Sequence, residues 1–217
     1  MGQYESALGP LHSGGWARTA WVFMAGGMLL GCLPAPAQPQ VSLEQLNESG
    51  QVMVDGRATQ YLIRHLPVNS FPQLPVSIQE QLRERGCLIP QTYEAHGPEN
   101  VVHASLVSRG SSDWAVLCSV KGTVSLLVFL SGSENEPTVL ASAPETERLQ
   151  AHGGRGVLGF NWGIDPATPE QVHEAQSGMD SRPPRLDHDA LADSVIEHKT
   201  VYHYFTKNAW TLVDMDE

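Results

Sequence analysis

The chain has 217 residues, of which 24 are acidic and 13 basic, for a formal net charge of −11. Its hydrophobic content of 41% and charged content of 17% are typical of a globular protein and exclude a disordered one. An acidic chain without a cluster of Lys and Arg is a poor candidate for nucleic acid, because phosphate contacts need those side chains. We therefore expect no nucleic-acid partner and attribute the acidity to solubility.

The first 37 residues have the pattern of an export signal. A polar start containing Arg18 precedes an apolar run over 20–33, which is too short and too closely flanked by charge for a good membrane-spanning helix. Two processing sites compete: cleavage after Ala37, and a bacterial lipobox that would make Cys32 the lipidated first residue of a lipoprotein. We expect a signal peptide over 1–37, a tether or lead-in over 38–50, and a single globular domain over 51–217.

Two cysteines, Cys87 and Cys118, remain once the signal is removed. A cysteine pair in an exported protein predicts one disulfide bond, and the alternative is two free thiols buried as small apolar groups. Closing that loop would stabilise the fold by roughly 3–4 kcal/mol in the chain-entropy model. We favour the disulfide because of the exported compartment.

Strand patterns dominate the chain after the tether. The runs 52–54 and 59–66 flank Asp55-Gly56, a favoured two-residue hairpin turn. Three further runs predict an antiparallel meander: 101–107, 114–120 and 123–130. Alternation is weak in the last two runs, so we expect those strands to be central and covered on both faces.

Two short helices interrupt the strands. Ile78 and Leu82 lie four residues apart on one face of a helix over 75–85, which places Cys87 just past the helix end. The sequence TPEQ from Thr168 has an N-cap, a Pro at the first helical position and a Gln at the third, and that helix should end near Gly178. The remaining strands are expected over 138–141, 157–162, 200–205 and 209–213. The predicted fold class is α+β, an antiparallel β-meander sheet with two short helices and one disulfide.

The stretch DHDALAD at 187–193 is the strongest candidate for a functional site in the sequence. Carboxylates of Asp187, Asp189 and Asp193 on a turning loop can converge on a hard cation such as calcium. However, Ala190 stands where the usual glycine would turn the chain, and no bidentate Glu follows at the EF-hand position. The alternative is that the aspartates are solvated or cap a helical turn formed by ALADSVIE, and we favour this alternative.

Other chemical motifs are weak. None of the nine histidines has HExxH spacing, and the chain has no G-x-S-x-G or P-loop motif. His203 alternates with Tyr202 and Tyr204 in a strand pattern, so it should face away from both. The aromatic residues Trp114, Trp162 and Trp210 would suit a carbohydrate or peptide groove, with burial in the core as the favoured alternative.

The strings GCLIPQTY, NVVHASL and DWAVLCS, followed by DHDALAD and VYHYF, resemble a group of uncharacterised exported bacterial proteins, chiefly acidobacterial. This resemblance spans most of 75–210 and implies export and a common fold unit, but no activity. A weaker similarity to the calcium-loop blades of integrin-type propellers runs through the meander and the Asp-rich loop. Because that loop lies far after the meander and no blade repeats, no function is carried over.

These observations predict an exported cell-envelope protein, either a binding or a structural domain. It would be periplasmic, anchored to the envelope or extracellular, with membrane contact only through its signal or a lipid anchor. The alternative is a metal-dependent envelope hydrolase that uses Asp187, Asp189 and Asp193 with a histidine. The sequence indicates no cofactor other than the calcium ion considered above.

Overall fold

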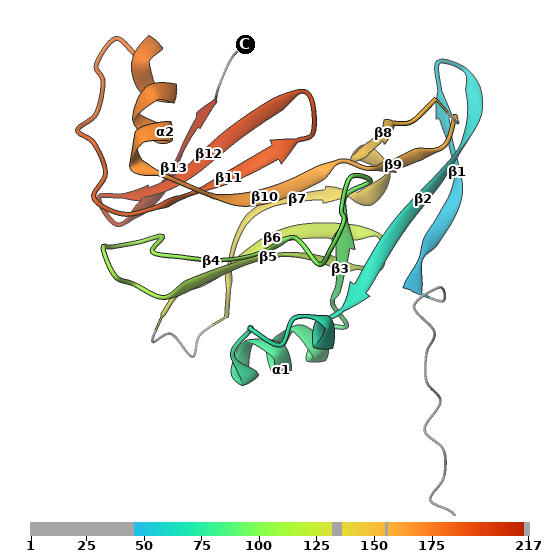
Figure 1. Cartoon of the computed structure of the whole chain (residues 1–217), viewed down its shortest axis with the longest axis horizontal. Helices are drawn as coiled ribbons and strands as arrows, with labels where there is room; N and C mark the ends of the chain where they lie inside the picture. The colour runs from blue at the N-terminus through green and yellow to red at the C-terminus, as the bar shows by residue number, and fades with distance from the viewer. Residues whose placement is uncertain (1–45, 132–135, 155, 215–217) are drawn as a thin grey trace, which may run out of the picture. The chain divides into compact units, whose positions relative to one another are not determined.

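The computed structural model describes residues 46–131, 136–154 and 156–214 (Figure 1). The expected export signal at 1–37, including Cys32, and the tether up to residue 45 lie outside the described residues. The expected lead-in over 38–50 overlaps the first strand, which begins at Glu48. No helix in the described ranges is long and apolar enough to cross a membrane.

Nine strands form a large sheet. They are β1 (Glu48–Val54), β2 (Arg57–Pro67), β3 (Leu88–Gln91), β4 (Val101–Ala104), β5 (Asp113–Val120), β6 (Thr123–Phe129), β7 (Thr138–Pro144), β8 (Leu149–Ala151) and β9 (Leu158–Phe160). The strand order is β7-β6-β5-β3-β2-β9-β8, with β1 on β2 and β4 on β5. All pairs are antiparallel except β2 with β9, and the meander of β4, β5 and β6 is as predicted.

Four antiparallel strands form a small sheet in the order β10-β11-β12-β13. Their bounds are β10 (Trp162–Ala167), β11 (Ala190–Val195), β12 (Lys199–Thr206) and β13 (Ala209–Asp214). Among the described residues, the α-helices are α1 (Val76–Glu84) and α2 (Pro169–Ala175), and short 3-10 turns include η2 (Val68–Ser70), η3 (Glu145–Glu147) and η4 (Gln176–Gly178). The predicted α+β class with two short helices is confirmed, and the second sheet is an addition to it.

Within residues 46–131, 136–154 and 156–214, the core consists of three apolar clusters that lie between successive layers. One cluster joins the inner faces of the two sheets, and the second packs α1 and η2 on the other face of the large sheet. The third packs α2 on the outer face of the small sheet. Figure 1 shows the helices on these separate faces. Strand β5 supplies both faces of the large sheet, with Ala115 and Leu117 in the first cluster and Trp114 and Val116 in the second, so its central position is confirmed.

The hairpin and helix ends follow their local sequence signals. Asp55 and Gly56 have positive φ angles of 48° and 76° and connect β1 to β2. At the end of α1, the Gly86 N–H donates to the Arg83 carbonyl and the Cys87 N–H donates to the Leu82 carbonyl, each at 2.9 Å. This pattern is a Schellman motif, and it needs the positive φ that Gly86 adopts without steric cost.

The disulfide between Cys87 and Cys118 is confirmed, with the two Cα atoms 5.4 Å apart. Cys87 directly follows the Schellman turn of α1, and Cys118 lies in β5. Both sulfurs are buried in the cluster between α1 and the large sheet. The bond therefore links the end of the helix to the sheet that the helix covers.

Two expected elements differ from the structure. The expected strand over 157–162 is two strands, because the chain passes from the large to the small sheet at Asn161, which bonds through its backbone to Arg148 and Ile196. The helical turn considered for ALADSVIE is wrong, since Ala190–Val195 is the strand β11. It lies between β10 and β12, where tertiary pairing overrides the helical preference of its alanines.

Candidate functional site

The three aspartates of the predicted metal loop have separate structural roles. Asp187 is exposed and accepts a hydrogen bond from His188 Nδ1 at 2.9 Å, which is the largest cause that lowers its pKa below the usual value. Asp189 accepts from the backbone N–H of Ser105 at 3.1 Å. Asp193 accepts from Trp162 Nε1 and from His203 Nε2.

These carboxylates therefore do not face a common point. In the described residues, no group of three or more His, Cys, Asp or Glu side chains is arranged to hold a metal ion. Calcium binding at this loop stays a prediction, and the geometry offers no ligand set on which to build it. His203 faces away from Tyr202 and Tyr204, as expected, and points toward Asp193 instead of solvent.

The three tryptophans do not form one groove. Trp162 is fully buried, with the Arg148 guanidinium carbon 4.3 Å from its ring centroid. Trp210 is half-buried in the small sheet, edge-on to Phe205 with ring centroids 5.5 Å apart. Trp114 lines a cleft on the large sheet. Trp162 and Trp210 both pack in the cluster between the two sheets, whereas Trp114 packs in the cluster under α1, so the described structure does not gather the three rings around one cleft.

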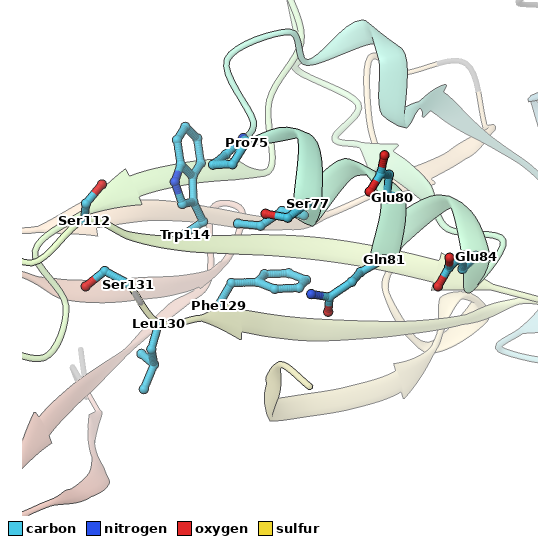
Figure 2. A pocket seen from close by; sticks show the side chains of 11 residues that line it. Pro75, Ser77, Glu80, Gln81, Glu84, Ser112, Trp114, Phe129, Leu130 and Ser131 are labelled. Atoms are coloured by element: carbon cyan, nitrogen blue, oxygen red, sulfur yellow. The ribbon is translucent and has the colours of Figure 1, made fainter. Parts of the chain in front are cut away.

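That cleft, which we call the α1 cleft, lies between α1 and the ends of β5 and β6 (Figure 2). It has a volume of about 600 Å³, within the usual size range of small-molecule sites. Its lining consists of one face of α1 and an aromatic floor: Pro75, Ser77, Ile78, Glu80, Gln81, Glu84, Ser112, Trp114, Phe129, Leu130 and Ser131.

The floor of the α1 cleft is a cross-strand pair. Trp114 of β5 is directly opposite Phe129 of β6, and both rings lie on the face of the sheet that α1 covers. Such pairs stabilise an antiparallel sheet and here also offer aromatic edges to the cleft. Trp114 is 8% and Phe129 6% exposed, so the floor is firmly held by its surroundings.

The wall of the cleft follows from helical periodicity. Ser77, Glu80, Gln81 and Glu84 occupy positions i, i+3, i+4 and i+7 and therefore lie on one side of α1. Ile78 and Leu82, which the sequence identified as the apolar face, are buried against the sheet. Figure 2 shows the Gln81 side chain beside the ring of Phe129.

A histidine supports the floor from the neighbouring strand. His103 of β4 is paired with Trp114 in the sheet, and their rings stack with centroids 4.3 Å apart at an interplanar angle of 13°. Its Nε2 lies 2.7 Å from the hydroxyl oxygen of Ser112, which lines the cleft. His103 thus holds the indole on one side and the Ser112 hydroxyl at the edge.

A buried carboxylate shapes the open end of the cleft. Asp113 is 0% exposed, and its oxygens accept from the backbone N–H groups of Leu106, Val107 and Ser131. The Ser111 hydroxyl also donates to it. These bonds end β4 at Ala104, short of the expected strand limit of 107, and bring the end of β6 against the turn before β5.

The charge of the α1 cleft is negative. Glu80 and Glu84 are exposed carboxylates, and no Lys or Arg is among the described residues that line the cleft. The nearest basic residues, Arg83 in α1 and Arg85 directly after it, are engaged elsewhere: Arg83 donates to Gln79 at 2.7 Å, and Arg85 lies 3.5 Å from Glu136. The cleft thus combines an aromatic floor, hydroxyl and amide groups, and two carboxylates.

A second cleft, the proline-rich cleft, lies between the segment 181–188 and the turn of β12 and β13, with a volume of about 900 Å³. Its lining includes Arg182, Arg185 and Lys207, so its charge is opposite to that of the α1 cleft. Two of these cations are already engaged, because Arg182 donates to the His173 carbonyl and Arg185 pairs with Glu170. We therefore regard the α1 cleft as the better candidate site.

Sequence reasoning missed the polar wall of the α1 cleft, although its signal was present in the i, i+3, i+4, i+7 spacing of residues 77–84. It also missed a buried ion pair between His65 and Glu145, with His65 Nε2 2.7 Å from a Glu145 oxygen. These two residues are 80 positions apart, so no local pattern could connect them.

Comparisons with known proteins do not assign the chain. No protein-family model, curated protein or solved structure matches it. The resemblance to exported acidobacterial proteins therefore stays a prediction.

Proposed function

We propose that this protein is an exported cell-envelope domain that binds a small ligand in the α1 cleft. The single observation that carries the proposal is the Cys87–Cys118 disulfide, because structural disulfides persist in oxidising compartments and are rare in the cytosol. The export signal expected at 1–37 supports the same compartment. The disulfide also lies directly beneath α1, so it holds the helical wall of the cleft in place.

The binding part of the proposal is supported by the composition of the cleft. Ligand sites combine apolar and aromatic surface with a few convergent polar groups. The α1 cleft has Trp114 and Phe129 in its floor, with Ser77 and Gln81 on its wall. All four belong to rigid strands or to a helix that is tied to the sheet, which favours a preformed site.

Export is tested by expressing the full chain in a bacterial host and fractionating the cells. We expect the protein outside the cytoplasm, with an intact mass that begins at Gln38 or at a lipidated Cys32. Denatured without reductant, it should not react with a maleimide at Cys87 or Cys118. Recovery from the cytoplasm with both thiols reactive would contradict the proposal.

Binding is tested by recording ¹H–¹⁵N spectra of the purified protein while small envelope-type molecules, such as amino sugars, amino acids and polyamines, are added. A ligand of the cleft should shift the indole N–H signal of Trp114. The variant Gln81→Ala, in the wall of the cleft, should weaken that binding, whereas Gln60→Ala on the exposed part of β2 should leave it unchanged. Equal effects of the two variants would place the ligand elsewhere.

A further inference from the structure

The two carboxylates of the α1 cleft occupy positions that disfavour negative charge. Glu80 and Glu84 are four residues apart on one helix, and like charges at this spacing repel each other. Glu84 is also the last residue of α1, where the helix dipole is negative and favours cations. Neither residue forms an ion pair within the described part of the chain.

The surroundings do not relieve this repulsion. Arg83 and Arg85 flank Glu84 in sequence but bond to Gln79 and Glu136. No cation lines the cleft in the described residues. A positively charged group bound in the cleft would offset both the repulsion between the carboxylates and the unfavourable dipole at the end of α1.

The remaining surface of the cleft suits an apolar stem. Ile78, Phe129 and Leu130 line it beside the edge of Trp114, and its volume of about 600 Å³ admits a small molecule. The chemistry of the lining therefore changes from apolar at the sheet to anionic at the helix.

We propose that the α1 cleft binds small organic cations, in which an ammonium or guanidinium group is carried on an apolar stem. The stem lies on Phe129 and Ile78, and the cationic head lies toward Glu80 and Glu84. This inference rests on the proposed function, because it names the ligand class of the same cleft.

The test uses three probes that share one stem and differ in charge: hexylammonium, hexanol and hexanoate. Each is titrated into the full mature protein at neutral pH and low salt, and the Trp114 indole N–H signal is followed. We expect hexylammonium to bind about threefold to tenfold more tightly than hexanol. This is the gain in affinity expected from two exposed charge contacts between the ammonium group and the carboxylates. Hexanoate should bind more weakly than hexanol.

The double variant Glu80→Gln/Glu84→Gln removes both charges and keeps the size of the side chains. It should bind hexanol as the parent protein does and lose the preference for hexylammonium. The matched control Glu174→Gln changes an exposed carboxylate on α2 and should keep the preference. Circular dichroism confirms that all variants are folded.

The outcomes separate this inference from the proposed function. If hexanol and hexylammonium bind equally, or if the preference survives in the double variant, the cation inference is wrong while ligand binding in the cleft stands. If no probe shifts the Trp114 signal, and none of the molecules tested above does, the cation inference and the binding part of the proposed function are both overturned.

Discussion

The large and the small sheet each bury a histidine against a carboxylate, but the two histidines are held differently. In the large sheet, His65 Nε2 lies 2.7 Å from Glu145 and its Nδ1 lies 3.0 Å from the Leu46 carbonyl. In the small sheet, His203 Nε2 lies 3.0 Å from Asp193, which also accepts from the Trp162 indole.

The difference has a consequence for charge. Both ring nitrogens of His65 face oxygen acceptors, so the ring satisfies them only when it donates from both, as an imidazolium. The pair with Glu145 is then a buried ion pair, with the two side chains 3% and 1% exposed. His203 needs one N–H to satisfy Asp193, so a neutral ring suffices. Similar side chains thus form a buried ion pair in one sheet and a hydrogen-bonded network in the other.

The largest expected effect comes from breaking the pair in the large sheet. Replacing Glu145 with Ala leaves a buried imidazolium without its counter-charge, and we expect the free energy of unfolding to fall by about 3–5 kcal/mol. Urea denaturation measures this loss. In a double-mutant cycle with His65→Ala, the two losses should not add, because both variants break one interaction. Additive losses would show that the two residues act independently.

The disulfide fixes the other side of the large sheet, and the small sheet has no counterpart within its described residues. Cys87 and Cys118 are separated by 31 positions, and loop closure over that length is worth about 3–4 kcal/mol in the chain-entropy model. The double variant Cys87→Ala/Cys118→Ala should lose that amount in urea denaturation. Reduction of the parent protein should give a similar loss, and an unchanged midpoint after reduction would contradict the prediction.

A smaller effect is expected in the small sheet. Asp193→Asn keeps the shape of the side chain but removes the charged acceptor of Trp162 and His203, which should cost about 1–3 kcal/mol. Thermal unfolding followed by near-ultraviolet circular dichroism reports both stability and the environment of Trp162. If Asp193→Asn lowered the free energy of unfolding as much as Glu145→Ala does, the distinction between the His65–Glu145 and His203–Asp193 pairs would be wrong.

Lowering the pH breaks the Glu145 pair partially. Burial is the largest single cause and raises the pKa of Glu145, but hydrogen bonds with His65, Ser119 and Glu48 and the charge of His65 together lower it more, so the pKa lies below its ordinary value of 4.5. The unfolded chain therefore takes up this proton more readily than the folded chain. The contribution of the group is fully present above about pH 4.5 and is lost as the pH falls through the folded pKa. We expect the parent protein and Glu145→Gln to differ in their free energy of unfolding by a constant amount above that pH. Below it, urea denaturation at successive pH values should show this difference becoming smaller.

The smallest expected effect concerns calcium. Each aspartate of the predicted metal loop already accepts hydrogen bonds from within the protein. Asp187 accepts from His188, Asp189 from Ser105, and Asp193 from Trp162 and His203. Adding calcium or removing it with a chelator should therefore leave the melting temperature unchanged. Only an ion that binds the folded state more tightly than the unfolded state would raise it. A calcium-dependent increase that disappears in Asp187→Asn would restore the metal loop and the hydrolase alternative.

Several elements could be predicted because their causes are local. Asp55 and Gly56 tolerate the positive φ of a tight hairpin, and the apolar spacing of Ile78 and Leu82 with Gly86 after them defines α1 and its end. The capping box of Thr168 with Gln171 forms at the start of α2, as expected. In each case the residues that cause the structure lie within a few positions of one another.

The sequence alone determined the helix ends, the hairpins, the central strands of the meander and the cysteine pair, since short-range sterics, periodicity and composition are sufficient for them. Tertiary structure alone decided the transfer of the chain at Asn161, the parallel pairing of β2 with β9, and the partners of His65 and the three aspartates. It also placed one side of α1 over the Trp114–Phe129 pair and so created the α1 cleft. These features join residues far apart in the chain, and their contacts exist only after the sheets have paired and packed.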